Sequence, residues 1–299
     1  MLKSNKRALP SIAITMGDPR GIGPEVIRRA LSKKSLLGQG RFIVIGNKKI
    51  LGRVPSLVQV LEVPYETAGE GSLKFLDRAV ALIKEKTVDA LVTAPVSKEA
   101  VSLYHKGFVG HTEYLAQAFG VRRFDMMFIA PYVRLTILTR HVPLRNVPDL
   151  ISVPVVFDSI ILMAQTLKKR FRVRSPKIAV LGLNPHAGEG GLLGSEDIKY
   201  ILPAIRKARA CGINTIGPLP ADTFFAFQTC PYDGIIAMYH DQGLAPLKAV
   251  YMKDLVNLTA GLPFVRTSPA HGTAFNIAGK NKADPSSMTA AIKLACELS

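Results

Sequence analysis

The stretch SIAITMGDPRGIGPEVIRRAL (residues 11–31) joins an apolar run to an amphipathic run through a glycine-bearing turn. Ser11–Met16 is almost continuously apolar or β-branched, which is typical of a strand covered on both faces. Pro24 suits the first turn of a helix, and the apolar residues of 26–31 repeat at helical spacing. Glycines in the turn let backbone N–H groups approach a ligand. The stretch therefore predicts a β-strand, a tight turn and an α-helix.

The same alternation of short apolar runs and helical patterns continues along the chain. Strands are predicted at Ser11–Met16, Arg41–Gly46, Val88–Thr93, Arg134–Thr139, Lys177–Gly182 and Gly234–Tyr239. Helices are predicted at Pro24–Leu31, Leu73–Lys86, Pro148–Phe171, Glu196–Ala210 and Ser286–Leu298. This order predicts an α/β fold with a mostly parallel sheet, in one domain or in two around a cleft.

The first turn does not match a conventional dinucleotide-binding fingerprint. It lacks the GxGxxG spacing, and Asn47 and Lys48 stand where an acidic residue is expected after the second strand. The residues alone leave two interpretations open, a plain βα turn or a turn that binds a ligand differently.

The composition is that of a folded and strongly basic protein. The 299 residues include 39 Lys and Arg against 22 Asp and Glu, a formal net charge of +17. A hydrophobic content of 48% excludes a disordered chain. The charge is compatible with a nucleic-acid or membrane partner, an anionic substrate, or a plain basic surface. The densest basic run, residues 168–177, lacks an aromatic ladder, which favours a solvated helix end.

Cysteine content and hydropathy predict the compartment. The cysteines Cys211, Cys230 and Cys296 form no CxxC pair, and their odd number argues against a disulfide framework. No apolar run reaches the roughly 18 residues of a membrane span, and no signal peptide precedes the first strand. We expect a cytoplasmic protein with no membrane partner.

Three histidines follow predicted strands, at the edge where α/β proteins build their sites. His141 comes after one strand, His186 after the next, and His240 after a third. Imidazole is a common ligand of zinc and related divalent ions, and three imidazoles leave positions open for substrate oxygens. No local metal motif has these spacings, so each histidine also fits an ordinary hydrogen-bonding role.

Other polar residues lie in similar turns. His111 and Thr112 begin a helix, where Thr112 could simply be a cap. Lys98, Lys248 and Arg266 suit a phosphate or carboxylate, although each also fits a surface charge. Asp241 is a candidate general acid or base, or a carboxylate that orients a metal ligand, and Asp222 lies in a comparable turn.

Taken together, these segments resemble the 4-hydroxythreonine-4-phosphate dehydrogenase family of pyridoxal-phosphate biosynthesis, over about residues 12–295. The most specific segments are GHTE (110–113), LNPHAGEGG (183–191), GPLPADT (217–223), MYHDQGLAPLK (238–248) and GLPFVRTS (261–268). GIGPE (21–25) and HGTAFNIAGK (271–280) are more distantly similar to isopropylmalate and isocitrate dehydrogenases.

The resemblance implies an isopropylmalate/isocitrate-dehydrogenase-like fold with two α/β/α domains flanking a central cleft. The first domain, on the cofactor side, would be discontinuous and comprise residues 1–108 and 257–299. The second, residues 109–256, would carry the metal ligands and the dimer contacts. The active site would lie at the interface of a homodimer.

The resemblance also implies a role for particular residues. The substrate ligands would be His111, Thr112, Lys248, Asn257 and Arg266. The metal ligands would be His141, His186 and His240, holding one Zn, Mg or Co ion. The segment with His271, Gly272, Thr273 and Asn276 would bind the cofactor. Asp241, Asp222 and Lys248 are the candidate catalytic residues.

The implied reaction is an NAD-dependent oxidation of the substrate's secondary alcohol, followed by loss of carbon dioxide to give 3-amino-2-oxopropyl phosphate. A divalent ion would lower the pKa of the alcohol and stabilise the enolate. Lys248 and Arg266 would neutralise the substrate's phosphate.

Three residues depart from the family pattern. Arg20 stands where a small residue is usual, Ala270 where an aspartate is usual, and Asn276 where the residue is often acidic. A less acidic cofactor segment makes NADP possible as well as NAD.

Two other functions remain open at this point. One is a related dehydrogenase of another phosphorylated hydroxy acid, such as a phospho-threonate. The other is a basic nucleic-acid-binding protein without catalysis, which the presence of all three histidines disfavours, so no nucleic-acid partner is expected.

Overall fold

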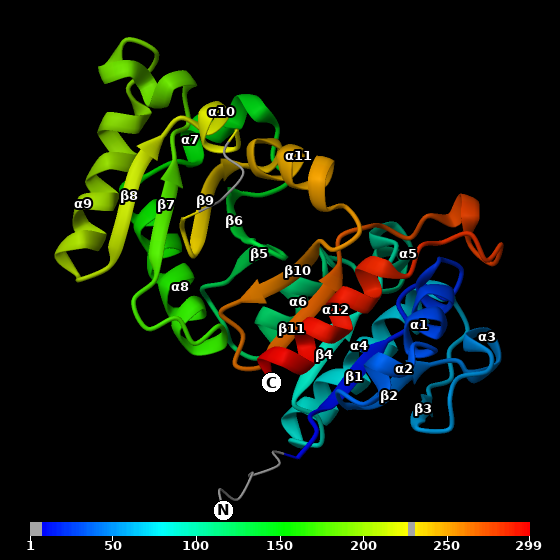
Figure 1. Cartoon of the computed structure of the whole chain (residues 1–299). Helices are drawn as coiled ribbons and strands as arrows, with labels where there is room; N and C mark the ends of the chain where they lie inside the picture. The colour runs from blue at the N-terminus through cyan, green and yellow to red at the C-terminus, as the bar shows by residue number, and fades with distance from the viewer. Residues whose placement is uncertain (1–7, 227–230) are drawn as a thin grey trace, which may run out of the picture. The chain divides into compact units, whose positions relative to one another are not determined.

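The chain folds into two compact units, Met1–Gly120 with Leu262–Ser299 (unit 1) and Val121–Gly261 (unit 2). The structure is a computed structural model, and it describes residues 8–226 and 231–299. Cys230 lies outside the described residues. In Figure 1, unit 1 combines the blue and cyan beginning of the chain with its red end. Unit 2 is therefore inserted into the sequence of unit 1.

Unit 1 is built on a parallel sheet of five strands. These are β1 (Ser11–Thr15), β2 (Arg41–Gly46), β3 (Val58–Glu62), β4 (Ala90–Thr93) and β11 (Val265–Pro269). Their order is β3-β2-β1-β4-β11, and the neighbours among them pair in parallel. Every residue of β1 is buried, as expected for a strand covered on both faces.

The helices of unit 1 cover this sheet. They are α1 (Gly23–Leu31), α2 (Lys34–Leu37), α3 (Lys48–Leu51), α4 (Ala68–Lys84), α5 (Lys98–Tyr104), α6 (His111–Ala118) and α12 (Ser286–Leu298), with a short 3₁₀ turn at Phe275–Ile277. α4 begins with a reciprocal cap, in which the Thr67 hydroxyl accepts from the backbone of Glu70 and the Glu70 carboxylate accepts from that of Thr67. α12 packs on β11, β4 and α1.

Unit 2 is built on a mixed sheet of six strands. These are β5 (Asp125–Ala130), β6 (Val133–Thr139), β7 (Lys177–Leu181), β8 (Asn214–Leu219), β9 (Gly234–Tyr239) and β10 (Val256–Ala260). Their order is β10-β5-β6-β9-β7-β8. β5 pairs antiparallel with β10 and β6, whereas β6, β9, β7 and β8 run parallel. The prediction of an α/β fold with a mostly parallel sheet is confirmed.

The helical segments of unit 2 include three that depart from α geometry. The segments are α7 (Val147–Leu150), α8 (Val153–Arg170), α9 (Leu202–Ala210), α10 (Ala221–Phe224) and α11 (His240–Tyr251), with a 3₁₀ turn at Leu144–Asn146, a 3₁₀ segment at Pro185–Gly191 and a π turn at Asp197–Ile201. The π turn directly precedes α9, so the helix predicted at Glu196–Ala210 begins with wider geometry.

The helix predicted at Pro148–Phe171 is broken. Ser152, before α8, is extended (φ −146°, ψ 159°). Pro154 has no N–H to donate to the carbonyl of Leu150, and its ring would clash with that carbonyl, so a continuous helix cannot pass this point and α7 ends at Leu150. Within the described ranges, no single helix is long and apolar enough to cross a membrane. The pair Leu144–Leu150 and Val153–Arg170 meets that criterion only jointly, with a bend of 89°.

The division into units differs from the sequence-based boundaries after residues 108 and 256. α6 lies in unit 1, where the Tyr114 hydroxyl hydrogen-bonds the carboxylate of Asp77 on α4. β10 lies in unit 2 because it pairs with β5, with Asn257 opposite Phe128. His111 and Thr112 are therefore residues of unit 1, and Asn257 is a residue of unit 2.

Candidate active site

A buried guanidinium forms the centre of the polar site in unit 1. Arg266, on β11, is 3% exposed. Its Nη2 donates to Oγ1 of Thr93 at 2.5 Å, and its Nη1 donates to Oγ1 of Thr112 at 3.5 Å. Thr93 ends β4, the parallel neighbour of β11, and Thr112 lies in the first turn of α6. Burial lowers the pKa of Arg266 to about 10, so the side chain remains a fixed positive charge at neutral pH.

A neutral histidine stands beside this charge. Burial, with added repulsion from Arg266 and Lys98, lowers the pKa of His111 to about 3. The ring of His111 lies 6.4 Å from that of Phe108 in an edge contact. A neutral imidazole and a hydroxyl next to a guanidinium suit a ligand that carries negative charge and hydroxyl groups.

We expect His111 to stay uncharged from about pH 8 to about pH 5. Its folded pKa lies below the value of about 6.5 in an unfolded chain, so protons bind the unfolded state first as the pH falls. The residue therefore lowers the free energy of unfolding below about pH 6.5 and leaves it unchanged above. A histidine NMR titration should show no movement of the His111 signal in this range. Comparison with His111→Asn assigns that signal, and a midpoint near 6.5 for it would contradict the assignment.

Two histidines and an aspartate gather in unit 2. β6 and β9 run parallel with Thr139 opposite Tyr239, so the loops that follow them begin at the same level. His141 lies in the loop after β6 and His240 is the first residue of α11, and their ring centroids are 5.5 Å apart. Nδ1 of His240 lies 2.7 Å from Oδ1 of Asp241. Both histidines and Asp241 line a cavity of about 280 Å³.

This geometry fits a divalent metal ion in part. A metal-bound histidine usually gives its other ring N–H to a carboxylate, which fixes the tautomer, and Asp241 provides that partner for His240. His186 does not join the pair, and within residues 8–226 and 231–299 no three potential ligands gather. The structure therefore brings together two of the three histidines that were predicted to bind the metal.

The His186 loop has an unusual backbone held by a buried acid. Residues 186–190 all have φ between 41° and 79°, which non-glycine residues rarely adopt. Asp197 is fully buried, and its carboxylate accepts from the backbone N–H of Leu183 at 2.8 Å and of Asn184 at 3.2 Å. The loop therefore starts from a rigid anchor while His186 itself is exposed.

Gln242 connects the two strand ends that lead to His240 and His186. Its Oε1 accepts from the backbone of Met238, and its Nε2 donates to the carbonyl of Gly182 at 2.6 Å. Sequence reasoning assigned no role to Gln242, to Asp197 or to Thr93. The only signal was a strand-end position for Thr93 and a position close to a predicted ligand for Gln242, whereas Asp197 lies within a predicted helix and gave no such signal.

Three further predicted residues of unit 2 lie apart from these contacts. Lys248 lies two turns beyond His240 on α11 and is partly exposed. Asn257 is 8% exposed, and its Oδ1 has no hydrogen-bond partner among the described residues. Such a buried acceptor is suited to a ligand hydroxyl or ammonium. Asp222 is exposed on α10, and no described contact connects it with a histidine.

The predicted cofactor segment packs against the first glycine-bearing turn. The carbonyl of Thr273 accepts from the backbone N–H of Ile22 at 2.9 Å. A side chain on Gly21 would come within 3.1 Å of the same carbonyl, so a larger residue there would require this segment to shift. Nδ1 of His271 lies 3.1 Å from the Gly272 carbonyl.

The segment offers an unpartnered nitrogen, among the described residues, and an open backbone position. Burial lowers the pKa of His271, and its Nε2 is buried without a partner in the described part of the chain. Gly272 has no atom within 4 Å of the position of a side chain, so its backbone is open to a ligand. Asn276, within the 3₁₀ turn, accepts from Nζ of Lys280 through its carbonyl at 2.8 Å.

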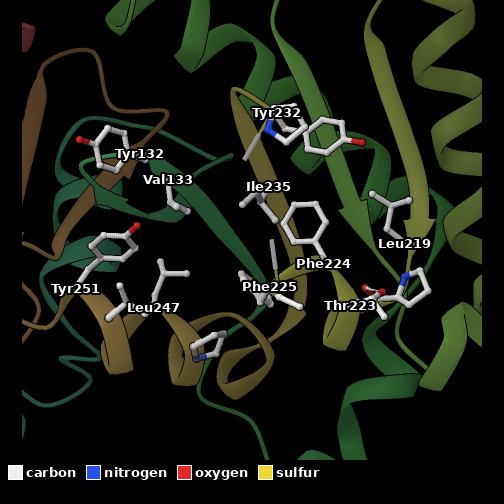
Figure 2. A pocket seen from close by; sticks show the side chains of 15 residues that line it. Tyr132, Val133, Leu219, Thr223, Phe224, Phe225, Tyr232, Ile235, Leu247 and Tyr251 are labelled. Carbon is white, nitrogen blue, oxygen red and sulfur yellow. Dashed lines mark hydrogen bonds between the residues drawn. The ribbon is translucent and has the colours of Figure 1, made fainter. Parts of the chain in front are cut away.

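An apolar cavity of about 690 Å³ also occurs in unit 2. Aromatic side chains face it, among them Tyr132, Phe224, Tyr232 and Tyr251 (Figure 2). None of the described residues that line it is charged. Its chemistry is therefore unsuited to a phosphorylated ligand, and none of the predicted site residues lines it.

Comparison with known proteins shows the family to which the chain is similar over most of its length. Residues 31–295 match the family described as Pyridoxal phosphate biosynthetic protein PdxA. A 4-hydroxythreonine-4-phosphate dehydrogenase of Desulfosudis oleivorans is 39% identical, covering 96% of this chain and 96% of that protein. A D-threonate 4-phosphate dehydrogenase of Cupriavidus necator is also 39% identical, covering 97% of each.

Solved structures show the same fold. A crystal structure of 4-hydroxythreonine-4-phosphate dehydrogenase from Klebsiella pneumoniae has a TM-score of 0.87 and 36% identity, covering 97% of this chain and 99% of that chain. The fold and the relatives define an oxidoreductase of the dehydrogenase class. The chain belongs to the PdxA family of pyridoxal phosphate biosynthetic proteins.

Proposed function

We propose that the enzyme oxidises the secondary alcohol of 4-hydroxythreonine 4-phosphate with NAD and that the product loses carbon dioxide to give 3-amino-2-oxopropyl phosphate. This places it in the biosynthesis of pyridoxal 5′-phosphate. The observation that carries the proposal is the buried Arg266, hydrogen-bonded to Thr93 and Thr112 beside a neutral His111. Relatives that carry the name of this activity align over nearly the whole chain.

The chain's own residues bind and orient the substrate. Arg266 supplies a positive charge for the phosphate, and its position is set by the two threonine hydroxyls. His111, being neutral, offers a hydrogen bond without changing the charge of the site. Two further ligands are proposed from unit 2. Lys248 would supply a point charge, and Asn257 would supply its Oδ1, an acceptor with no described partner.

We assign His141, His186 and His240 to one divalent ion, Zn, Mg or Co. When bound, such an ion lowers the pKa of the substrate alcohol and stabilises negative charge on the ketone oxygen. Asp241 orients His240 through its contact with Nδ1. His141 and His240, whose ring centroids lie 5.5 Å apart, would supply two of the ligands, and His186 would supply the third.

The proposed cofactor ligands are His271, Gly272, Thr273 and Asn276. NAD supplies the hydride acceptor, while the protein supplies its position. The open backbone at Gly272 and the unpartnered Nε2 of His271 support this assignment. Proton transfer is assigned to Asp241, Asp222 or Lys248, of which Asp241 lies beside a proposed metal ligand.

A second substrate, D-threonate 4-phosphate, has comparable support. Relatives named for that activity are as similar in sequence as those named for the first. The two substrates differ in an ammonium against a hydroxyl on the second carbon, so both require the same phosphate and metal ligands. We further propose that the enzyme is a cytoplasmic homodimer with no nucleic-acid or membrane partner.

The decisive experiment follows NADH formation with each of the two phosphorylated substrates, with and without a chelator. We expect turnover of 4-hydroxythreonine 4-phosphate at a kcat/KM at least about tenfold above that of D-threonate 4-phosphate, which is a discrimination of about 1.4 kcal/mol. The chelator should abolish it, and excess divalent ion should restore it. The reverse preference would select the second substrate, and no turnover of either would reject the proposal.

A further inference from the structure

A cavity of about 280 Å³ in unit 1 lies beside the proposed cofactor segment. Its lining includes Arg20 from the first turn, Arg28 from α1, Gly279 from the end of the segment 271–280, and Asn281 just after it. None of the residues assigned above to substrate, metal or cofactor lines it. The cavity therefore has no role in the proposed function so far.

Arg20 is held in a fixed orientation at this cavity. Its backbone N–H and its Nε both donate to Oδ1 of Asp18, at 2.9 Å and 3.1 Å, and its Nη2 donates to Oδ2 at 3.0 Å. Asp18 is fully buried. The guanidinium carbon lies 5.5 Å from the ring centroid of Phe275. These bonds leave Nη1 of a preorganised guanidinium available to a ligand.

Two more groups complete the cavity. Nη2 of Arg28 donates to Oδ1 of Asn281 at 2.9 Å, which positions a second guanidinium. Glu25, 6% exposed, also lines the cavity, and its Oε1 accepts from the backbone of Ala283 and lies 3.7 Å from Arg29. Its Oε2 has no hydrogen-bond partner in the described ranges.

This set of groups matches a phosphorylated sugar. Two guanidiniums suit a phosphate monoester, which carries up to two negative charges, better than they suit the singly charged phosphates of a pyrophosphate. A buried carboxylate oxygen without a donor suits a hydroxyl group. Both groups occur together on the adenosine ribose of NADP, whereas NAD has no monoester there.

We propose that this cavity binds the 2′-phosphate of NADP through Arg20 and Arg28, so that NADP binds more tightly than NAD. The inference rests on the nicotinamide-dependent oxidation proposed above. It assigns a function to Arg20, whose guanidinium lines the cavity. The cavity's neighbour Phe275 and the segment 271–280 then bind the same end of the cofactor.

The test is a calorimetric titration of the full-length protein with adenosine 2′,5′-bisphosphate and with adenosine 5′-monophosphate. We expect the bisphosphate to bind at least about tenfold more tightly, because charge-assisted bonds to a phosphate are worth more than that factor. Arg28→Ala should remove most of this difference and leave the monophosphate unaffected. Arg78→Ala, which removes a partly exposed arginine of α4 paired with Glu85, is the matched control and should change neither.

Arg20→Lys provides a second variant, since it retains a charge but not the fork that Asp18 orients. It should weaken bisphosphate binding while its thermal unfolding midpoint reports whether the turn is intact. Equal affinity for the two adenosine phosphates would overturn the inference. An equal loss of affinity for both in Arg28→Ala would also overturn it, and these results would indicate a site for the 5′-phosphate. Turnover with NAD but no NADP preference defeats the inference alone. Absence of turnover with both cofactors defeats the proposed function. The titration still tests whether the cavity binds the 2′-phosphate, because it does not depend on turnover.

Discussion

Replacing Arg266 with methionine should lower kcat/KM for the phosphorylated substrate by about a thousandfold, which corresponds to about 4 kcal/mol, while the fold is retained. The guanidinium is 3% exposed and is positioned by Thr93 and Thr112. Its loss would leave a phosphate without its buried counter-charge, and truncating such a pair costs several kcal/mol. Methionine fills a similar volume, so the packing between β11 and β4 should survive.

The stability of this variant separates a binding role from a structural one. Burial of a charge carries a desolvation penalty, and an apolar residue of similar size is often neutral or stabilising in its place. Chemical denaturation should therefore show a free energy of unfolding that is unchanged or higher. Arg78→Met serves as the control and should retain full activity. Full activity of Arg266→Met would refute the phosphate assignment, and a large loss of stability would indicate a structural role.

His240→Ala is expected to abolish turnover, with kcat at least about a thousandfold lower, and to weaken binding of the divalent ion by about a hundredfold or more. Without its imidazole, His141 is left as the single histidine in the cavity at the ends of β6 and β9. Metal affinity is measured by calorimetry on the chelator-treated protein, independently of activity. His105→Ala, at an exposed position after α5, should change neither quantity. Unchanged metal binding in His240→Ala would exclude this residue as a ligand.

Asp241→Asn distinguishes the two roles considered for this carboxylate. If it orients His240, the variant should bind the metal about ten- to a hundredfold more weakly. If it transfers a proton, kcat should fall while metal affinity stays the same. The 2.7 Å contact with Nδ1 of His240 favours the first result.

The fold was predictable where one short segment determines its own structure. Residues 11–31 form β1, the turn and α1 as expected, because every residue of β1 is buried and Pro24 begins the helix. Strands such as β11 (VRTSP) and β8 (NTIGPL) were not predicted, because their sequences are mostly polar or contain proline. They are strands because longer-range partners, β4 and β7, supply their hydrogen bonds.

The candidate site was predictable as a set of residues but not as an arrangement. His141 and His240 meet because β9 lies between β6 and β7, an order that no local pattern reveals. Residues 186–190 adopt left-handed backbone angles and His186 does not join them, although all three histidines follow strands. The burial of Arg266 depends on the packing of α12 and β4 around β11, while its own segment predicts a surface charge.

The insertion of unit 2 into unit 1 has a consequence for synthesis on the ribosome. β4 emerges early, yet its partner β11 and the covering helix α12 come from the last forty residues or so of the chain. β4 therefore lacks its partner strand β11 until the whole of unit 2 has been translated. Unit 2, by contrast, has all its strands in one continuous segment. The nascent chain should thus complete unit 2 before unit 1.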